Sequence, residues 1–164
     1  MNEYLSGEAS ASPAVEPLLE GARRLAAKGL GSGLLSARNG LRTTTHAAVP
    51  FEMLSPNDFL EVADYDPHLD RLLLIGKREP HPFAGLHALV FRAKREVGAI
   101  AMVDLAGREA AGVPEAKKGH TTLENAMGVL EALRGRDAVR WRQFLVATGR
   151  TPDEAISRAE AILA

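Results

Sequence analysis

The sequence predicts an α/β domain in which helices pack on the faces of a partly antiparallel sheet. Segments with helical periodicity alternate with short apolar or hairpin-forming segments, in the order helix, hairpin, strands, helix, strand, helix, strand, helix. The pair Asn39-Gly40 lies between two short extended runs, and both residues tolerate the positive φ of a tight turn. This pair therefore indicates an antiparallel hairpin in the first half of the chain.

Apolar periodicity and capping residues predict the helices. The first runs over residues 12–29, with Ser12 as its cap and glycines at its end. Two more are expected over 83–93 and 123–133, where apolar residues recur at helical spacing. The last helix follows Thr151, which is placed as a cap.

Apolar runs outside these helices predict the strands. One helical turn starting at Ser55 precedes a strand around residues 60–63. The continuous apolar run 71–76 is typical of a strand covered on both faces, and the run 97–104 of a core strand. The segment 137–149 is expected to form one further strand.

Length and composition are those of a single ordinary domain. The chain has 164 residues, 46% of them hydrophobic, and we expect a flexible tail at residues 1–12 and a single domain at 13–164. Twenty basic and twenty-one acidic residues give a net charge of −1, so no overall field attracts nucleic acid or a membrane. With no cysteine, no secretory signal and no run that could span a bilayer, a cytoplasmic location is expected.

Four phrases, which follow one another within residues 14–164, carry a family resemblance. These are "GLGSGLLSAR", "TTTHAAVPFEMLSPNDFLEV", "GLHALVFRAKREVGAI" and "RWRQFLVATGRTPDEAISRAEAI". In order and spacing they resemble the class II aldolase and adducin head-domain family, which includes the L-fuculose-phosphate aldolases. The resemblance implies a three-layer α/β/α fold around a central mixed, largely antiparallel sheet. It also implies homo-oligomers, typically tetramers.

The chain departs from this family where the family's metal chemistry is carried. Family members polarise a carbonyl with zinc, held by a His-x-His on the central strand and by a later histidine, and use a glutamate ahead of the central helix as acid/base. The matching positions here are Met102, Asp104, Gln143 and Phe83. One carboxylate is not a zinc site, and a thioether is a poor zinc ligand. No cofactor is therefore predicted, and no catalytic residue is assigned.

The family's phosphate-binding residues are replaced too. Its Gly-Asn, Thr-Gly and Ser-Ser pairs become Gly33-Leu34, Ala47-Ala48 and His81-Pro82. Residues 31–33 can still present backbone N–H groups to an anion, although a plain tight turn is the competing interpretation. The candidate substrate-binding residues are Gly31, Ser32, Gly33, Thr45, His46 and His81.

Three functional hypotheses follow. The first is a diverged, non-catalytic member of the family that lacks the zinc ligands and the glutamate, and retains small-metabolite binding and homo-oligomerisation. The second is a zinc-dependent sugar-phosphate aldolase, a lyase, with ligands relocated to His81, Asp104 and His120. The third is an interaction module like the adducin heads, which predicts an exposed apolar patch and a protein partner.

The phrase "RGRDAVRWR" is a small basic cluster with one aromatic residue. On a single strand, Arg140 and Arg142 would share one face and Trp141 would point to the other, into the core. We interpret the cluster as a solvated or intersubunit edge, because it is too small to indicate nucleic-acid binding.

Overall fold

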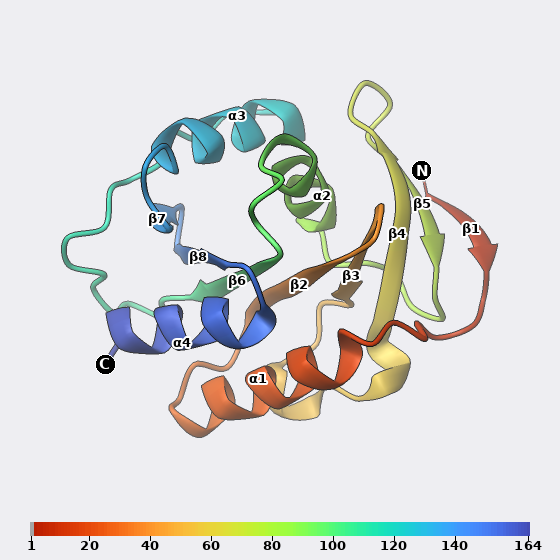
Figure 1. The fold of residues 1–164 in the computed structure, drawn as a ribbon, viewed down its shortest axis with the longest axis horizontal. Helices are drawn as coiled ribbons and strands as arrows, with labels where there is room; N and C mark the ends of the chain where they lie inside the picture. Colours follow the sequence, from red (N-terminus) through yellow and green to blue (C-terminus); the bar gives the residue numbers. More distant parts are fainter. Residues whose placement is uncertain (1) are drawn as a thin grey trace.

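The computed structural model describes residues 2–164, which contain one eight-stranded sheet (Figure 1). The helices are α1 (Val15–Ala27), α2 (Ala84–Ala93), α3 (Thr122–Ala132) and α4 (Pro152–Ile162). The strands are β1 (Glu3–Ser6), β2 (Gly33–Asn39), β3 (Arg42–His46), β4 (Phe59–Asp66), β5 (Arg71–Ile75), β6 (Ala99–Asp104), β7 (Ala138–Trp141) and β8 (Phe144–Gly149). Two single turns of 3-10 helix, Phe51–Met53 and Pro56–Asp58, precede β4. None of the helices in this part of the chain has the length and apolar character needed to cross a membrane.

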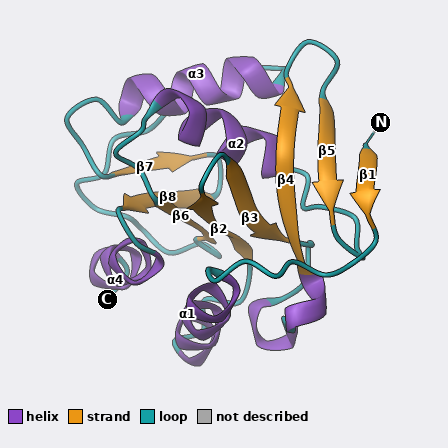
Figure 2. Cartoon of the chain, turned by 45° about the vertical axis from the view of Figure 1, so that its right-hand side comes forward, coloured by secondary structure: helices purple, strands orange, loops and turns teal. Residues whose placement is uncertain are grey.

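The sheet has the strand order β1-β5-β4-β3-β2-β6-β8-β7. Every neighbouring pair is antiparallel except β1 and β5, which are parallel. Helices α1 and α4 pack on one face of the sheet, and α2 and α3 pack on the other (Figure 2). The expected three-layer fold with a mixed, largely antiparallel sheet is therefore confirmed.

The central strand β6 is buried on both faces. Ile100 and Met102 pack against the side covered by α2 and α3, whereas Ala99, Ala101 and Val103 pack against the side covered by α1 and α4. None of these five side chains is more than 1% exposed. The core strand predicted from the apolar run 97–104 is confirmed.

The predicted hairpin connects β2 and β3, with its turn one residue later than expected. Asn39 pairs with Arg42, so the two turn residues are Gly40 and Leu41. Gly40 has a φ of 61°, a conformation that glycine adopts at little cost. Asn39 instead belongs to β2, and its side chain donates a hydrogen bond to the carboxylate of Glu61 at 2.8 Å.

The tail expected at residues 1–12 contains a strand. Residues 3–6 form β1 along the outer edge of β5, while Met1 lies outside the described residues. Ser10 is also tied to the sheet, because its backbone N–H donates to the carbonyl oxygen of Phe59 at 3.2 Å. The segment is polar and has little to bury, so its pairing comes from the unpaired backbone groups that an edge strand offers.

The segment 137–149 forms a hairpin rather than the single strand expected from its sequence. Strands β7 and β8 are joined by Arg142 and Gln143, and Arg142 has a φ of 53°. This turn has no glycine, proline or asparagine, so none of the usual turn residues indicates it. Trp141 is fully buried as expected, but Arg142 lies in the turn and does not share a strand face with Arg140.

Strand β5 is covered on only one face, contrary to the prediction of cover on both. Leu72 and Leu74 are buried toward α2, whereas Leu73 and Ile75 are half-buried. The strand lies next to the edge of the sheet. Helices α1 and α4 cover the opposite face only farther in, and no residue of β5 packs against them.

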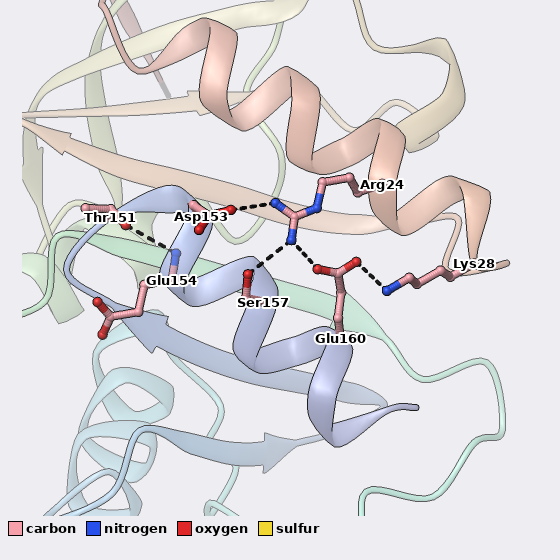
Figure 3. Close-up of polar contacts among 7 residues, drawn as sticks. All are labelled: Arg24, Lys28, Thr151, Asp153, Glu154, Ser157 and Glu160. Atoms are coloured by element: carbon pink, nitrogen blue, oxygen red, sulfur yellow. Dashed lines mark hydrogen bonds and ion pairs between the residues drawn. The ribbon is translucent and has the colours of Figure 1, made fainter.

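A polar cluster joins α1 to α4 (Figure 3). The guanidinium of Arg24 donates to Asp153 at 2.6 Å, to Ser157 at 3.1 Å and also to Glu160. The ammonium of Lys28 lies 2.6 Å from the second carboxylate oxygen of Glu160. Burial raises the pKa of Glu160, but the hydrogen bonds and positive charges of Lys28 and Arg24 outweigh this effect and lower it.

We expect Glu160→Gln to lower the free energy of unfolding by about 1 kcal/mol, because it removes the shared negative charge between two cations. Urea unfolding followed by circular dichroism measures this change. The matched control is Glu20→Gln on the exposed face of α1, since Glu20 takes part in no ion pair within residues 2–164. Equal midpoints for the two variants would contradict a stabilising role for the cluster.

Candidate functional site

One end of the sheet brings together residues that are far apart in the sequence. Asp104, at the end of β6, pairs with Phe144, at the start of β8. The ring of Phe83, just before α2, lies 5.7 Å from the ring of Phe144. The carbonyl oxygen of Gln143 accepts a hydrogen bond from the N–H of Leu105 at 2.8 Å. Positions 83, 104 and 143, which the family resemblance matched to the acid/base and to two zinc ligands, are therefore neighbours.

Aromatic rings fill this end of the sheet on the side of α2. Trp141 stacks on Phe144 with ring centroids 6.1 Å apart, and Phe83 meets the Trp141 ring edge to face at 4.9 Å. Met102 is fully buried in the same apolar cluster. At position 83 the chain thus has a packing side chain with no proton to transfer.

Among the predicted site residues at this end of the sheet, His81 has a ring nitrogen, Nε2, that makes no hydrogen bond within residues 2–164. Its Nδ1 accepts a hydrogen bond from the N–H of Phe83 at 3.1 Å, which places the ring proton on Nε2. Burial lowers the pKa of His81 to about 4. Near neutral pH, His81 is therefore an uncharged hydrogen-bond donor rather than a cation.

Thr45 and His46 are buried, and their polar atoms are used within the fold. Nε2 of His46 accepts from the N–H of Leu35 at 2.9 Å, and its Nδ1–H donates to the carbonyl oxygen of Ala47 at 2.7 Å. The hydroxyl of Thr45 accepts from that of Ser36 at 2.9 Å. These contacts give both residues a structural role at the end of the β2–β3 ladder.

The three loop residues predicted to hold an anion differ in their surroundings. Gly31 and Ser32 are exposed, and the carbonyl oxygen of Ser32 accepts from the N–H of Asp104 at 2.9 Å. Gly33 is buried with a φ of 147°, and a Cβ at this position would lie 2.0 Å from the carbonyl oxygen of Met102. The close approach of β2 to β6 therefore requires this glycine, whereas Gly31 and Ser32 border the site.

No protein-family model and no curated protein sequence matches the chain. Solved structures match over most of its length. L-Fuculose-1-phosphate aldolase from Thermus thermophilus is 23% identical, with a TM-score of 0.67 over 92% of this chain and 87% of that one. An aldolase II superfamily protein from Pseudomonas syringae is 16% identical, with a TM-score of 0.72 over 92% and 73%. A sugar-phosphate aldolase from Thermotoga maritima is 17% identical, with a TM-score of 0.69 over 91% and 90%.

The chain has the class II aldolase fold. At these identities the likeness concerns the fold, and the chemistry has to be argued from this chain's own residues.

The residues present do not fit the zinc ion of class II aldolases. Met102 keeps its thioether in the core, and the carboxylate of Asp104 accepts a hydrogen bond from the N–H of Ala106 at 2.8 Å. Within residues 2–164, no three histidine, cysteine, aspartate or glutamate side chains lie close enough to hold a metal ion. A protein zinc site needs at least three such ligands.

The relocated ligand set His81, Asp104 and His120 is not assembled in the class II aldolase fold of this chain. His120 is exposed ahead of α3, where its backbone N–H donates to Glu124 at 2.7 Å. His81 instead contacts Phe83 before α2. Within the described part of the chain the three residues form no such group, and the relocated set stays a prediction.

A hollow of about 530 Å³ adjoins Gln143, and no motif in the sequence indicates it. It lies between the loop after β6 and the β7–β8 turn, and its charged lining includes Arg108, Arg140 and Arg142. Arg140 is paired with Glu115 at 2.8 Å. The guanidinium carbon of Arg142 lies 4.9 Å from the centre of the buried Trp141 ring, and Arg142 itself is exposed.

We expect the protein to lose stability as the pH falls below neutrality, and His46 contributes to this loss. Burial lowers the pKa of His46 from 6.5 to about 4. Between these values the unfolded chain binds a proton that the folded chain does not bind, so acid favours unfolding. The free energy of unfolding should fall by about 1.4 kcal/mol per pH unit for this residue alone.

Urea unfolding at several pH values between 7 and 5 measures the slope. In His46→Gln the side-chain carbonyl oxygen can still accept the hydrogen bond from the Leu35 N–H, but the side chain no longer titrates. Its free energy of unfolding should therefore depend less on pH, by the equivalent of about one proton taken up on unfolding. A wild-type stability that is the same at both ends of this range would contradict the prediction.

Proposed function

We propose that this chain is a diverged protein of class II aldolase fold that does not carry out zinc-dependent aldol cleavage. In its place it binds a small polar metabolite, and it does so as a homo-oligomer. Solved relatives in fold include enzymes named as L-fuculose-1-phosphate aldolase and sugar-phosphate aldolase. The resemblance to their family suggests that the metabolite is an anion of similar size.

The convergence of positions 83, 104 and 143 carries this proposal. These residues come from three separate segments and meet at one end of the sheet, as the components of one site would. Their side chains are a phenyl ring, a carboxylate and an amide, and Met102 adds a thioether in the core. Such a set can pack and form hydrogen bonds, but it provides neither the three ligands for zinc nor an acid/base at position 83.

The remaining polar groups around this end support binding. His81 can donate a hydrogen bond from Nε2, and Arg108 and Arg142 border the hollow beside Gln143. An anion in the hollow would be held by Arg108 and Arg142, with Glu109 as the carboxylate in the same lining. The adducin-like interaction hypothesis stays a prediction.

Metal content tests the proposal directly. Protein purified without chelator or histidine tag is analysed by elemental mass spectrometry, and its mass is measured by light scattering in the same preparation. We expect zinc well below one atom per chain, an oligomer, and no cleavage of L-fuculose 1-phosphate after zinc is added. About one zinc per chain, or measurable cleavage, would overturn the non-catalytic assignment, and a monomer would overturn the oligomer.

A restored site tests whether positions 102, 104 and 143 correspond to the zinc ligands. The triple variant Met102→His, Asp104→His, Gln143→His places three imidazoles at these positions. We expect it to bind zinc far more tightly than the wild type, while Asp104→His alone should not. Circular dichroism confirms that each variant is folded. A folded triple variant without zinc affinity would contradict the correspondence.

A further inference from the structure

A groove of about 610 Å³ lies at the end of α2 opposite the candidate site. Phe83 and His81 mark the start of this helix, whereas Phe91, Arg92 and Arg95 mark its end and line the groove. The end of β2, the start of β3 and the middle of β4 complete its walls. The groove and the candidate site thus occupy opposite ends of the same three elements, α2, β2 and β3.

The groove concentrates positive charge. Four arginines line it, and Asp64 is the only carboxylate in the lining, which leaves three positive charges unbalanced. The whole chain has a net charge of −1, so this concentration is local to the groove. The lining arginines are Arg38, Arg42, Arg92 and Arg95.

Arg38 is a fixed charge without a carboxylate partner among the described residues. Its guanidinium donates to the carbonyl oxygens of Phe91 at 2.7 Å, Lys94 at 3.1 Å and Val97 at 2.9 Å. These acceptors orient the group, but they are neutral and leave its positive charge in place. Its central carbon also lies 5.3 Å from the centre of the Phe91 ring.

Arg42 and Arg95 are free to turn toward a ligand. Both are exposed, and neither side chain makes an ion pair or a hydrogen bond within residues 2–164. Arg92 is partly engaged, with Asp64 at 3.4 Å and the carbonyl oxygen of Tyr65 at 2.8 Å. Two exposed guanidiniums beside a fixed one match the needs of a phosphate group, which accepts several charge-assisted hydrogen bonds at once.

The floor of the groove is less polar than its rim. Thr43, Val62, Ala88 and Phe91 line it and are all less than 9% exposed. The volume lies in the range of small-molecule sites, and a flat bilayer or a nucleic-acid duplex would not reach this floor. The geometry points to a binding site for a small organic polyanion, such as a phosphate ester, whose phosphate is held by Arg42 and Arg95 over the charge of Arg38. This inference does not depend on the proposed function.

Isothermal titration calorimetry with inorganic pyrophosphate at low ionic strength tests the site. We expect saturable binding by the wild type and binding weaker by roughly tenfold or more in Arg42→Ala/Arg95→Ala, because two charge-assisted hydrogen bonds are lost. The matched control, Arg23→Ala/Arg134→Ala, removes the same charge from two exposed arginines outside the groove. Its affinity should stay within about twofold of the wild type.

Three outcomes would overturn the inference. The first is no saturable binding by the wild type up to about 10 mM pyrophosphate. The second is loss of binding in Arg108→Ala/Arg142→Ala instead, which would place the anion in the hollow beside Gln143. The third is a protein that does not bind pyrophosphate but sediments with phosphatidylglycerol vesicles, and does so only when Arg42 and Arg95 are present. That result would assign the two arginines to a membrane surface.

Discussion

Gly33→Ala is expected to lower the free energy of unfolding by about 3–5 kcal/mol, a large part of the stability of an ordinary domain. The added Cβ would lie 2.0 Å from the carbonyl oxygen of Met102, which is backbone inside the sheet and cannot rotate away. The φ of 147° at Gly33 adds strain for any residue with a side chain. Because β2 and β6 are both interior strands of the sheet, the damage would extend to both layers of helices.

The test is urea unfolding of Gly33→Ala beside Gly31→Ala, two residues earlier in the same loop. Gly31 has no atom within 4 Å of an added Cβ, so its replacement should change stability by less than about 0.5 kcal/mol. Equal stability of the two variants would contradict the structural requirement at Gly33. The pair also separates the two interpretations of residues 31–33, because an anion-binding role alone would not make Gly33 essential for folding.

Trp141→Ala is expected to cost about 3–5 kcal/mol of stability. The indole is fully buried between Phe83 and Phe144, and its removal would leave a cavity at the point where α2, β7 and β8 meet. The cluster includes Phe83, the position matched to the family's acid/base, so this variant measures how much packing at this position contributes to stability.

Trp141→Phe is the informative comparison. The indole N–H is buried and has no hydrogen-bond partner among the described residues, so its removal leaves no other polar atom unpaired. A phenyl ring keeps most of the aromatic contact, and we expect a cost of about 1 kcal/mol. If thermal and urea unfolding showed Phe to be as destabilising as Ala, an unrecognised interaction of the indole N–H would have to account for it.

If both proposals hold, the chain has two polar sites at opposite ends of α2. The site at the helix start has His81 as a neutral donor beside an aromatic cluster. The groove at the helix end has arginines and no histidine in its lining. Both places present guanidiniums to an anion, Arg108 and Arg142 at the first and Arg42 and Arg95 at the groove, so binding at each should weaken as ionic strength rises.

The sequence alone determined the elements whose signals are local. Helical periodicity and the cap at Thr151 depend on residues within a few positions, and α4 begins there, with the Thr151 hydroxyl accepting from the N–H of Glu154. The run 99–103 was recognisable as a core strand because every residue in it is apolar. The family resemblance, which rests on the order of four phrases, correctly indicated the class II aldolase fold.

The tertiary structure decided whatever depends on partners distant in the sequence. Residues 3–6 became a strand because β5 offered an open edge, and His46 became structural because Leu35 and Ala47 occupy its two nitrogens. The groove joins Arg38 and Arg42 to Arg92 and Arg95, which lie some fifty residues later in the chain. No local pattern encodes such a meeting, since it arises only when antiparallel pairing and helix packing bring separate segments to the same end of the sheet.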